Sequence, residues 1–293
     1  MSPISHTDLI LNPDGSIYHL HLLPEDIADT IILVGDPGRV DQVSSHMDHV
    51  ELKKANREFV THTGFFRRKR ISVISTGIGT DNIDIVLNEL DALVNVDLES
   101  RTIRPDHTSL NLIRIGTSGA LHADIPAGAQ IVTQVAGGFD GLYHFYKDEK
   151  NITVPGLADS FMNFTGWEKS HAEPYFIKGS EKLFSLFSEA NQVSGITLST
   201  PGFYGPQVRS IRLSPFDKAL IEKVGSFTFN GMRINNFEME SSALYALSSL
   251  LEHDAITICV AIANRISLAF LEDYQSAVDE LITTVLDKLA TYD

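Results

Sequence analysis

The sequence predicts an α/β protein built as a three-layer sandwich, with helices on both faces of a central β-sheet. Short runs of apolar and β-branched residues alternate along the chain with stretches whose apolar residues recur at helical spacing. The apolar runs are continuous rather than alternating, which is typical of strands covered on both faces. Because the 293 residues contain no repeat, low-complexity tract or convincing linker, we expect a single domain spanning residues 1–293.

The expected strands follow the apolar runs in chain order. They cover residues 31–35, 71–76, 110–116, 129–136, 196–200, 233–240 and 255–264. A layered sandwich, rather than a helical bundle or a barrel, accounts for their alternation with helical patterns.

Helices are expected where apolar residues recur every three or four positions. The first helix carries its apolar stripe at Ile83, Val86, Leu87, Leu90 and Val94. Thr80 or Asp81 is its N-terminal cap. A second helix begins near Ser241, and a third covers about residues 271–291.

Two segments are expected to be loop insertions. One covers residues 97–109, and the other is the Gly- and aromatic-rich stretch 137–178. The longer one either closes over a site or alters what the site accepts, and the sequence leaves these alternatives open.

Composition excludes several classes of function. With 43% hydrophobic and 21% charged residues the chain has an ordinary globular composition, and no apolar run reaches the length of a membrane span. A net charge of −15 argues against a nucleic-acid or anionic-membrane partner, so arginines must cluster locally to hold any anionic substrate. The single cysteine, Cys259, allows no disulfide within the chain, and the N-terminus lacks the pattern of a secretory signal. We therefore expect a cytoplasmic protein.

Glycines and arginines follow two of the expected strands. GDPGR at 35–39 and RIGTSG at 114–119 combine glycines, which let backbone N–H groups approach a ligand, with an arginine and, in the second stretch, hydroxyls. Either alone is as well explained by a tight turn with a surface arginine. Together with Arg57 they favour a phosphate or carboxylate site. Neither is a Walker loop, and TGIGT at 76–80 lacks the remainder of a dinucleotide fingerprint.

A pair of carboxylates ends the strand at 233–240. Glu238 and Glu240 point to one face if the chain is still extended there. They form a glycosidase dyad, accept hydrogen bonds from sugar hydroxyls, or favour a helix N-terminus electrostatically. The histidines, such as His19 and His21, show no metal-ligand spacing, so we infer no zinc site.

The stretch FYGPQVR at 203–209 contains a forced bend. Gly205 and Pro206 turn the chain, so that Phe203, Gln207 and Arg209 gather around one small space. A flat apolar wall, an amide and a guanidinium together suit a planar, polar ring. The alternative is a surface loop with a solvated arginine.

Taken together, these stretches resemble one enzyme family. The motifs, in chain order, are GDPGR, NREF, STGIG, RIGTSG, FYGPQVR, NFEMES and AIANR. Their order and spacing resemble the nucleoside phosphorylase family of trimeric and hexameric enzymes, and in particular its uridine branch, from about residue 16 to the C-terminus. The resemblance implies a phosphorylase/hydrolase-like α/β domain with a central mixed β-sheet. It also implies a homodimer as the minimal active unit, often assembled into a homohexamer.

The resemblance implies reversible phosphorolysis, in which phosphate attacks C1′ of a nucleoside to give ribose 1-phosphate and free base. The matching phosphate ligands are Gly35, Arg39, Arg114 and Thr117, with Arg57 contributed across the dimer interface. The ribose contacts are Met239 and Glu240, supported by Glu238, with His19 reaching the 5′ hydroxyl of the neighbouring subunit. The base contacts are Phe203, Gln207 and Arg209. The residues implied to carry catalysis are Arg39, Arg114, Arg209 and Glu240.

The resemblance implies no required cofactor, with inorganic phosphate as co-substrate. It leaves open a monovalent cation, K⁺, between subunits. The positions that match its ligands are Glu58, Ile78 and Asn82, where Asn82 replaces a serine.

The stretch after the last core strand separates two branches of the family. Purine phosphorylases are expected to carry an aspartic acid there to protonate the purine, whereas this chain has Ala263, Asn264 and Arg265. Uridine, with deoxyuridine as a further substrate, is therefore the expected nucleoside; a purine or broad-specificity phosphorylase is the alternative. A nucleoside-binding scaffold without activity is the third. The arginines at 39, 57 and 114 favour phosphorolysis over hydrolysis.

Overall fold

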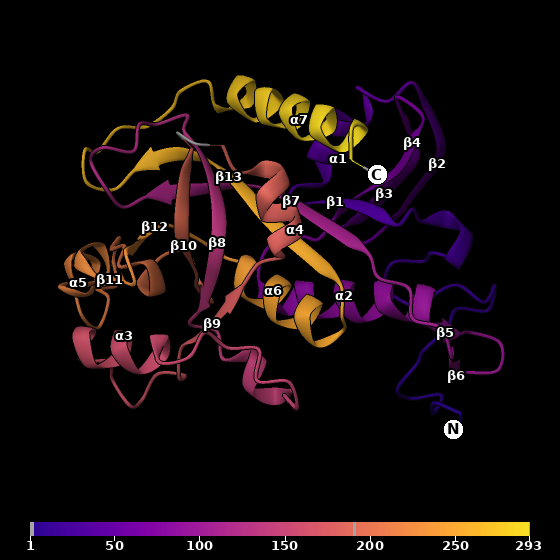
Figure 1. Cartoon of the computed structure of the whole chain (residues 1–293), viewed down its shortest axis with the longest axis horizontal. Helices are drawn as coiled ribbons and strands as arrows, with labels where there is room; N and C mark the ends of the chain where they lie inside the picture. Colours follow the sequence, from indigo (N-terminus) through magenta and orange to yellow (C-terminus); the bar gives the residue numbers. More distant parts are fainter. Residues whose placement is uncertain (1–2, 190–191, 293) are drawn as a thin grey trace.

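A computed structural model of the chain describes residues 3–189 and 192–292, and its centre is a mixed β-sheet (Figure 1). Its strands are β1 (Thr30–Val34), β2 (His49–Asn56), β3 (Phe59–Phe66), β4 (Lys69–Ser75), β7 (Asn111–Ala120), β8 (Gln130–Gly138), β9 (Tyr175–Lys178), β10 (Val193–Ser199), β11 (Thr228–Phe229), β12 (Met232–Glu238) and β13 (Asp254–Asn264). Strand β1 pairs in parallel with β4 and β7, whereas β2, β3 and β4 pair antiparallel. The predicted α/β class and mixed sheet are confirmed.

Part of this sheet closes on itself. Strand β12 pairs with β10, and its end also pairs with β7, where Phe237 lies opposite Gly119 and Asn236 opposite Ala120. Strands β7, β12, β10, β8 and β13 therefore form a ring. The apolar pattern did not predict this closure, which brings the ends of β7 and β12 together.

Helices cover both faces of the sheet. They are α1 (Pro37–Ser44), α2 (Thr80–Asn95), α3 (Leu157–Thr165), α4 (Glu181–Phe187), α5 (Leu220–Ser226), α6 (Ser241–Leu250) and α7 (Tyr274–Ala290). In Figure 1, α7 runs along one side of the strands, and α2 and α6 pack together on the opposite side. The three helices expected from the sequence correspond to α2, α6 and α7.

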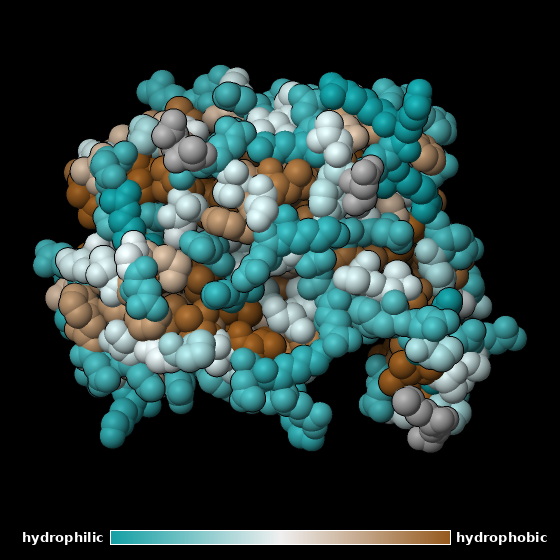
Figure 2. Space-filling view, in the orientation of Figure 1, coloured by the Kyte–Doolittle hydropathy of each residue, from teal (hydrophilic) through white to brown (hydrophobic). Residues whose placement is uncertain are grey.

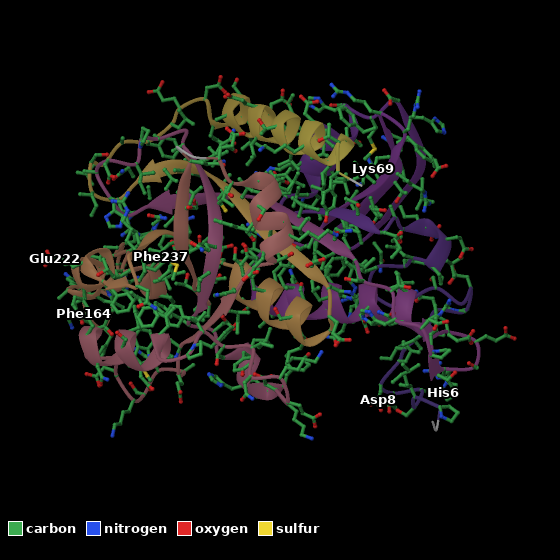
Figure 3. The ribbon with its side chains drawn as sticks, viewed as in Figure 1. His6, Asp8, Lys69, Phe164, Glu222 and Phe237 are labelled. Atoms are coloured by element: carbon green, nitrogen blue, oxygen red, sulfur yellow. The ribbon has the colours of Figure 1, made fainter. Side chains whose placement is uncertain are left out.

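The apolar core has two main parts. The larger one lies between the sheet and helices α2, α6 and α7, and the smaller one packs beneath α3 and α5. Phe237 belongs to the smaller part and lies inside the molecule on the side of α3 and α5 (Figure 3). Figure 2 shows polar and charged side chains over most of the viewed face, with apolar surface visible between them. None of the described helices has the length and apolarity needed to cross a membrane.

The segment 137–178 is not an irregular loop, contrary to expectation. It contains the end of β8, helix α3 and strand β9, which pairs antiparallel with β8. Phe161 and Trp167 from this segment join the smaller core. Residues 97–109 are more nearly a loop, with only the short pairing of β5 (Val96–Asp97) and β6 (Thr102–Ile103). Short elements such as α3 and β9 do not repeat an apolar pattern often enough to be recognised.

We predict that Gly137→Ala lowers the free energy of unfolding by about 1–3 kcal/mol, because the position is overpacked. An added Cβ would lie 2.4 Å from the Phe176 ring and 2.7 Å from Leu198 Cδ2. Urea denaturation measures the change. The control is Gly225→Ala in α5, whose Cβ would come no closer than 3.6 Å to Leu121 O and which we expect to be neutral or slightly stabilising. Equal stability of the two variants would contradict this packing.

Candidate active site

A cavity of about 920 Å³ opens where the ring of strands meets the end of β1. Its lining residues are Gly35, Asp36, Pro37, Arg39, Glu58, Gly77, Ile78, Asn82, Arg114, Thr117, Ser118, Gly119, Phe203, Gln207, Arg209, Phe237, Glu238, Met239, Glu240, Ile262, Ala263 and Phe270. All the site residues singled out in the sequence line it, except His19 and Arg57. Segments more than 200 residues apart thus converge because β7 lies between β1 and β13 and also pairs with β12.

Arg114 is the buried charge at the centre of the cavity. Its guanidinium donates a hydrogen bond to Glu240 Oε2, and Nη1 lies 3.4 Å from Glu238 Oε2. Burial opposes its charge, but the carboxylates of Glu240 and Glu238 raise the pKa of Arg114 above its ordinary value. Gly116 is required beside it, because an added Cβ would lie 2.0 Å from Arg114 Nη1 and 2.8 Å from Cys259 Sγ.

The two carboxylates have different partners. Glu238 accepts the backbone N–H groups of Glu240, at 3.0 Å, and Ser241, at 3.1 Å, and the Ser199 hydroxyl donates to it. It therefore holds the first turn of α6, which is the helix-terminus role considered above. Glu240 Oε1 accepts the Gly79 N–H at 2.8 Å. Burial raises the pKa of Glu240, Arg114 opposes that effect and Glu238 adds to it.

Arg39 adds a second guanidinium at the same end of the cavity. It lies in the first turn of α1, whose N-terminus is capped by Asp36 through a 2.9 Å bond from Gly38 N–H. Burial lowers the pKa of Arg39, and the neighbouring charge of Arg114 lowers it further. The hydroxyl of Ser118, which also lines the cavity, is buried without a hydrogen-bond partner among the described residues. Two guanidiniums and a free hydroxyl are suited to an anion.

The 203–209 loop lines another part of the same cavity. The buried Gln207 donates from Nε2 to Thr200 Oγ1 at 3.0 Å, and its Oε1 accepts Arg209 Nη1 at 3.1 Å. The Arg209 guanidinium lies 4.0 Å from the centre of the Phe203 ring. Burial, with the charge of Arg265, lowers the pKa of Arg209 to about 10. The expected amide, guanidinium and aromatic wall thus lie together.

Arg265 is a neighbour of this loop to which the sequence analysis gave no role. Its Nη1 donates to Gln207 O at 2.9 Å, just before Val208, whose φ of 58° is left-handed. A guanidinium on the main chain stabilises this turn, where a β-branched residue is strained. The signal in the sequence that could have identified Arg265 was its position directly after Asn264, at the end of the AIANR motif. Asn264 itself donates to His122 O and Ile125 O, both at 2.7 Å, so its amide supports the chain around the site.

His19 and Arg57 lie outside the cavity of their own chain, next to each other. Asn56 Nδ2 donates to His19 O at 2.8 Å, and the Arg57 guanidinium lies 5.8 Å from the centre of the Tyr18 ring. Arg57 occupies the β2–β3 turn with a φ of 55°. The two residues expected from a neighbouring subunit are therefore neighbours on one surface.

The expected cation ligands Glu58, Ile78 and Asn82 all line the cavity. Asn82 Nδ2 donates to Ile78 O at 3.4 Å, which leaves a second lone pair on that carbonyl. Carbonyl, amide and carboxylate oxygens are the kind of ligand that potassium takes. The donor set therefore fits such an ion.

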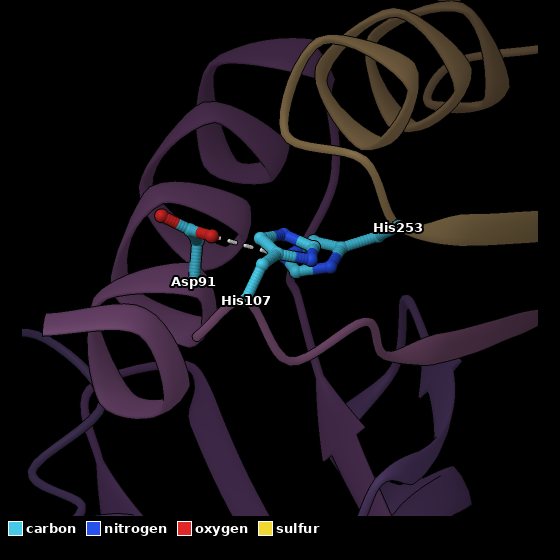
Figure 4. Close-up of side chains that lie close together, drawn as sticks. All are labelled: Asp91, His107 and His253. Carbon is cyan, nitrogen blue, oxygen red and sulfur yellow. Dashed lines mark ion pairs between the residues drawn. The ribbon is translucent and has the colours of Figure 1, made fainter. Parts of the chain in front are cut away.

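Asp91, His107 and His253 form a separate polar cluster, shown in Figure 4. His253 Nδ1 accepts the Leu110 N–H at 3.2 Å, so the proton is on Nε2, which lies 3.3 Å from Asp91 Oδ1. His107 Nε2 lies 3.0 Å from Leu251 O, to which it donates, and the two rings stack with centres 5.7 Å apart and planes at 27°. The nitrogen lone pairs of His107 and His253 lie in the planes of their rings. Because the two rings are stacked, these lone pairs do not point at one common ion. The cluster is better explained as a link between α2 and the start of β13.

We predict that Arg114→Met destabilises the fold by about 3–5 kcal/mol at pH near 8, because it leaves two buried carboxylates unpaired. Without Arg114, the folded-state pKa of Glu240 rises further above its unfolded value. Folding then favours the protonated acid, so the loss of stability shrinks as pH falls toward about 5. Urea denaturation at both pH values measures this. Lys147→Met, which breaks an exposed ion pair with Glu149, is the control and should change stability by less than about 0.5 kcal/mol. A loss independent of pH would contradict the assignment.

The comparisons with known proteins agree with this geometry. A family model described as the phosphorylase superfamily matches residues 29–289. A uridine phosphorylase of Thermococcus kodakarensis is 30% identical over 260 residues, covering 88% of this chain and 80% of that protein. A DeoD-type purine nucleoside phosphorylase of Brevibacillus brevis is 26% identical, covering 92% and 97%. A crystal structure of a Trypanosoma brucei nucleoside phosphorylase, described as showing uridine phosphorylase activity, matches with a TM-score of 0.84 at 29% identity, covering 97% of this chain and all of that one. The chain belongs to the phosphorylase superfamily.

Proposed function

We propose that this nucleoside phosphorylase, a pentosyltransferase, catalyses the reversible phosphorolysis of uridine, and of deoxyuridine, to uracil and the pentose 1-phosphate. One observation carries the proposal. A single cavity is lined both by the guanidiniums of Arg39 and Arg114, which suit an anion, and by the linked side chains of Phe203, Gln207 and Arg209. Uridine phosphorylases among its relatives support the same substrate.

Phosphate binds at the Arg39 and Arg114 end. The backbone of Gly35 and the hydroxyl of Thr117 also line the cavity, and we assign them as the further phosphate donors. Arg57 supplies a further guanidinium from the partner subunit, in keeping with its place outside its own cavity. The burial that lowers the pKa of Arg39 also keeps water from competing with the anion.

Ribose lies between the phosphate and the base, over Met239 and Glu240. Glu240 accepts hydrogen bonds from the 2′ and 3′ hydroxyls, and Glu238 keeps it in place by holding the first turn of α6. His19 of the partner subunit reaches the 5′ hydroxyl. Since Glu240 also binds Arg114, the sugar and phosphate positions are set by one ion pair.

Uracil stacks against Phe203 and presents its polar edge to Gln207 and Arg209. The amide of Gln207 supplies one donor and one acceptor, which matches the N3–H and a carbonyl of the base. The guanidinium of Arg209 faces a carbonyl oxygen. Substrate binding replaces the bond between Gln207 and Arg209 with bonds to the ring.

The reaction is a displacement at C1′. A phosphate oxygen forms the new bond to C1′ as the C1′–N1 bond breaks. The electron pair of the C1′–N1 bond leaves with uracil. The phosphate dianion stabilises the oxocarbenium-like sugar, and Arg209 with Gln207 stabilises the uracil anion. No general acid is required, because the ring delocalises its charge into its carbonyls.

The alternative is a purine or broad-specificity phosphorylase. It is favoured by the similarity to DeoD-type purine phosphorylases along nearly their whole length. Asn264, the last residue of β13, supplies no acid and donates hydrogen bonds to backbone carbonyls. That favours uridine over a purine.

We propose a homodimer as the minimal active unit, assembled into a homohexamer in the cytoplasm, with K⁺ between subunits at Glu58, Ile78 and Asn82. The separation of Arg57 and His19 from their own cavity supports the dimer. The buried Cys259 thiol, whose pKa burial raises to about 12, stays protonated and accords with a reducing compartment.

The test is release of free base from uridine and from inosine, each with and without phosphate, followed by chromatography. We expect phosphate-dependent release of uracil, and at least about tenfold slower release of hypoxanthine, because the chain lacks an acid for the purine. Preferred cleavage of inosine would support the purine alternative. Release without phosphate would replace phosphorolysis by hydrolysis.

A second prediction concerns Arg57. The Arg57→Ala and Arg209→Ala variants should each lose most activity. A mixed dimer should regain one active site of its two, because the Arg57→Ala subunit has an intact cavity and receives Arg57 from its partner. Subunits mixed at random should recover roughly a quarter of the wild-type rate. The control mixes Arg39→Ala with Arg209→Ala, both within one cavity, and should recover nothing. Equal rates for the two mixtures would rule out a shared site.

A further inference from the structure

Glu89 of α2 holds the segment that carries His19. Its carboxylate accepts the His19 backbone N–H, at 2.9 Å to Oε1 and 3.1 Å to Oε2, and the Leu20 N–H at 2.8 Å. The same carboxylate lies 2.6 Å from His19 Nδ1. One side chain therefore fixes both the backbone and the ring of His19.

This arrangement determines the tautomer of His19. A carboxylate oxygen only accepts hydrogen bonds, so Nδ1 must carry the proton that bridges to Glu89. In the neutral ring, the lone pair is then on Nε2, at the far side of the imidazole from Glu89. Nε2 has no hydrogen-bond partner among the described residues, and the His19 side chain is 28% exposed. His19 therefore presents an acceptor to whatever meets this surface.

The surface around His19 is also ordered by its neighbours. Asn56 donates to His19 O at 2.8 Å, and Tyr18 packs edge-on against the His19 ring with centres 4.8 Å apart. The Arg57 guanidinium lies over the Tyr18 ring, 5.8 Å from its centre. The segment is thus held from α2 on one side and from the β2–β3 turn on the other. An acceptor at Nε2 is presented in a fixed direction.

We propose that Glu89 is a positioning residue that fixes His19 as the Nδ1–H tautomer, so that Nε2 accepts a hydrogen bond from the 5′ hydroxyl of the nucleoside in the partner's cavity. This inference rests on the proposed function, in which His19 reaches that hydroxyl. A 5′ hydroxyl is a donor and matches the Nε2 lone pair. A fully ionised 5′ phosphate offers only acceptors and meets the negative charge of Glu89 nearby, so nucleotides are disfavoured.

The test compares uridine with 5′-deoxyuridine, which lacks only the 5′ hydroxyl. In Glu89→Gln, the amide NH₂ can donate to Nδ1, which favours the other tautomer, in which Nε2 carries the proton and the 5′ hydroxyl has to accept instead of donate. The single remaining oxygen also no longer holds the His19 segment as both carboxylate oxygens do. We expect kcat/KM for uridine to fall by about tenfold, chiefly through KM, with little change for 5′-deoxyuridine. On a His19→Ala background, Glu89→Gln should have no further effect on uridine.

Asp26→Asn is the matched structural control. Asp26 also accepts a backbone N–H from its own neighbourhood, that of Leu23 at 2.7 Å, and binds Lys54, but it has no histidine to orient. The Asp26→Asn substitution should change kcat/KM for uridine and for 5′-deoxyuridine equally. An equal effect of Glu89→Gln on both substrates, or none on uridine, would overturn the proposal.

Assays with both uridine and inosine distinguish a failure of this proposal from a failure of the proposed function. If the wild-type enzyme cleaves inosine rather than uridine, the base assignment is wrong, and inosine with 5′-deoxyinosine tests Glu89 in the same way because the sugar is the same. A chain that cleaves no nucleoside would overturn both.

Discussion

The rest of the site depends on one buried charge, the guanidinium of Arg114. Removing an arginine from water is expensive unless carboxylates meet it, and here Glu240 and Glu238 do so. That requirement explains several features that otherwise look unrelated. Gly116 leaves room for the guanidinium, and Glu238 holds the turn from which Glu240 points back. The pairing of β7 with β12 places both carboxylates within reach.

The same ion pair links the site to the surrounding helices. Glu240 Oε1 binds the N–H of Gly79, at the start of α2, while Glu238 caps α6. Helices α2 and α6 pack against each other on one face of the sheet. Farther along α2, Glu89 holds His19. One helix therefore connects Glu240 in the cavity with His19 on the surface outside it.

The sequence predicted the parts of this structure that depend on repeated local patterns. Continuous apolar runs indicated β1, β7 and β13, and regular spacing indicated α2, α6 and α7. Strand β2 alternates exposed and half-buried residues and contains two lysines, so it lacks the buried-strand signal. The closure of β7 on β12 depends on pairing between distant residues, which local patterns do not contain. For the site, the motifs identified most residues that line the cavity. Arg265 and Glu89 act through contacts with residues distant in sequence, namely the Gln207 backbone for Arg265 and the His19 backbone and ring for Glu89, and a local pattern does not contain such contacts.

The buried arginines of the cavity would serve both directions of the proposed reaction. Burial lowers the pKa of Arg39 and of Arg209, which means that each positive charge is less stable at its place in the protein than in water. Each therefore gains when negative charge arrives beside it. In the proposed reaction, phosphate would bring that charge to Arg39 before the bond breaks, and uracil would bring it to Arg209 as the bond breaks; in reverse, the order is exchanged. Because these groups are held in place before reaction, little reorganisation is needed in either direction. A chain with a net charge of −15 can thus bind two anionic partners, because its positive charge is concentrated where they form and depart.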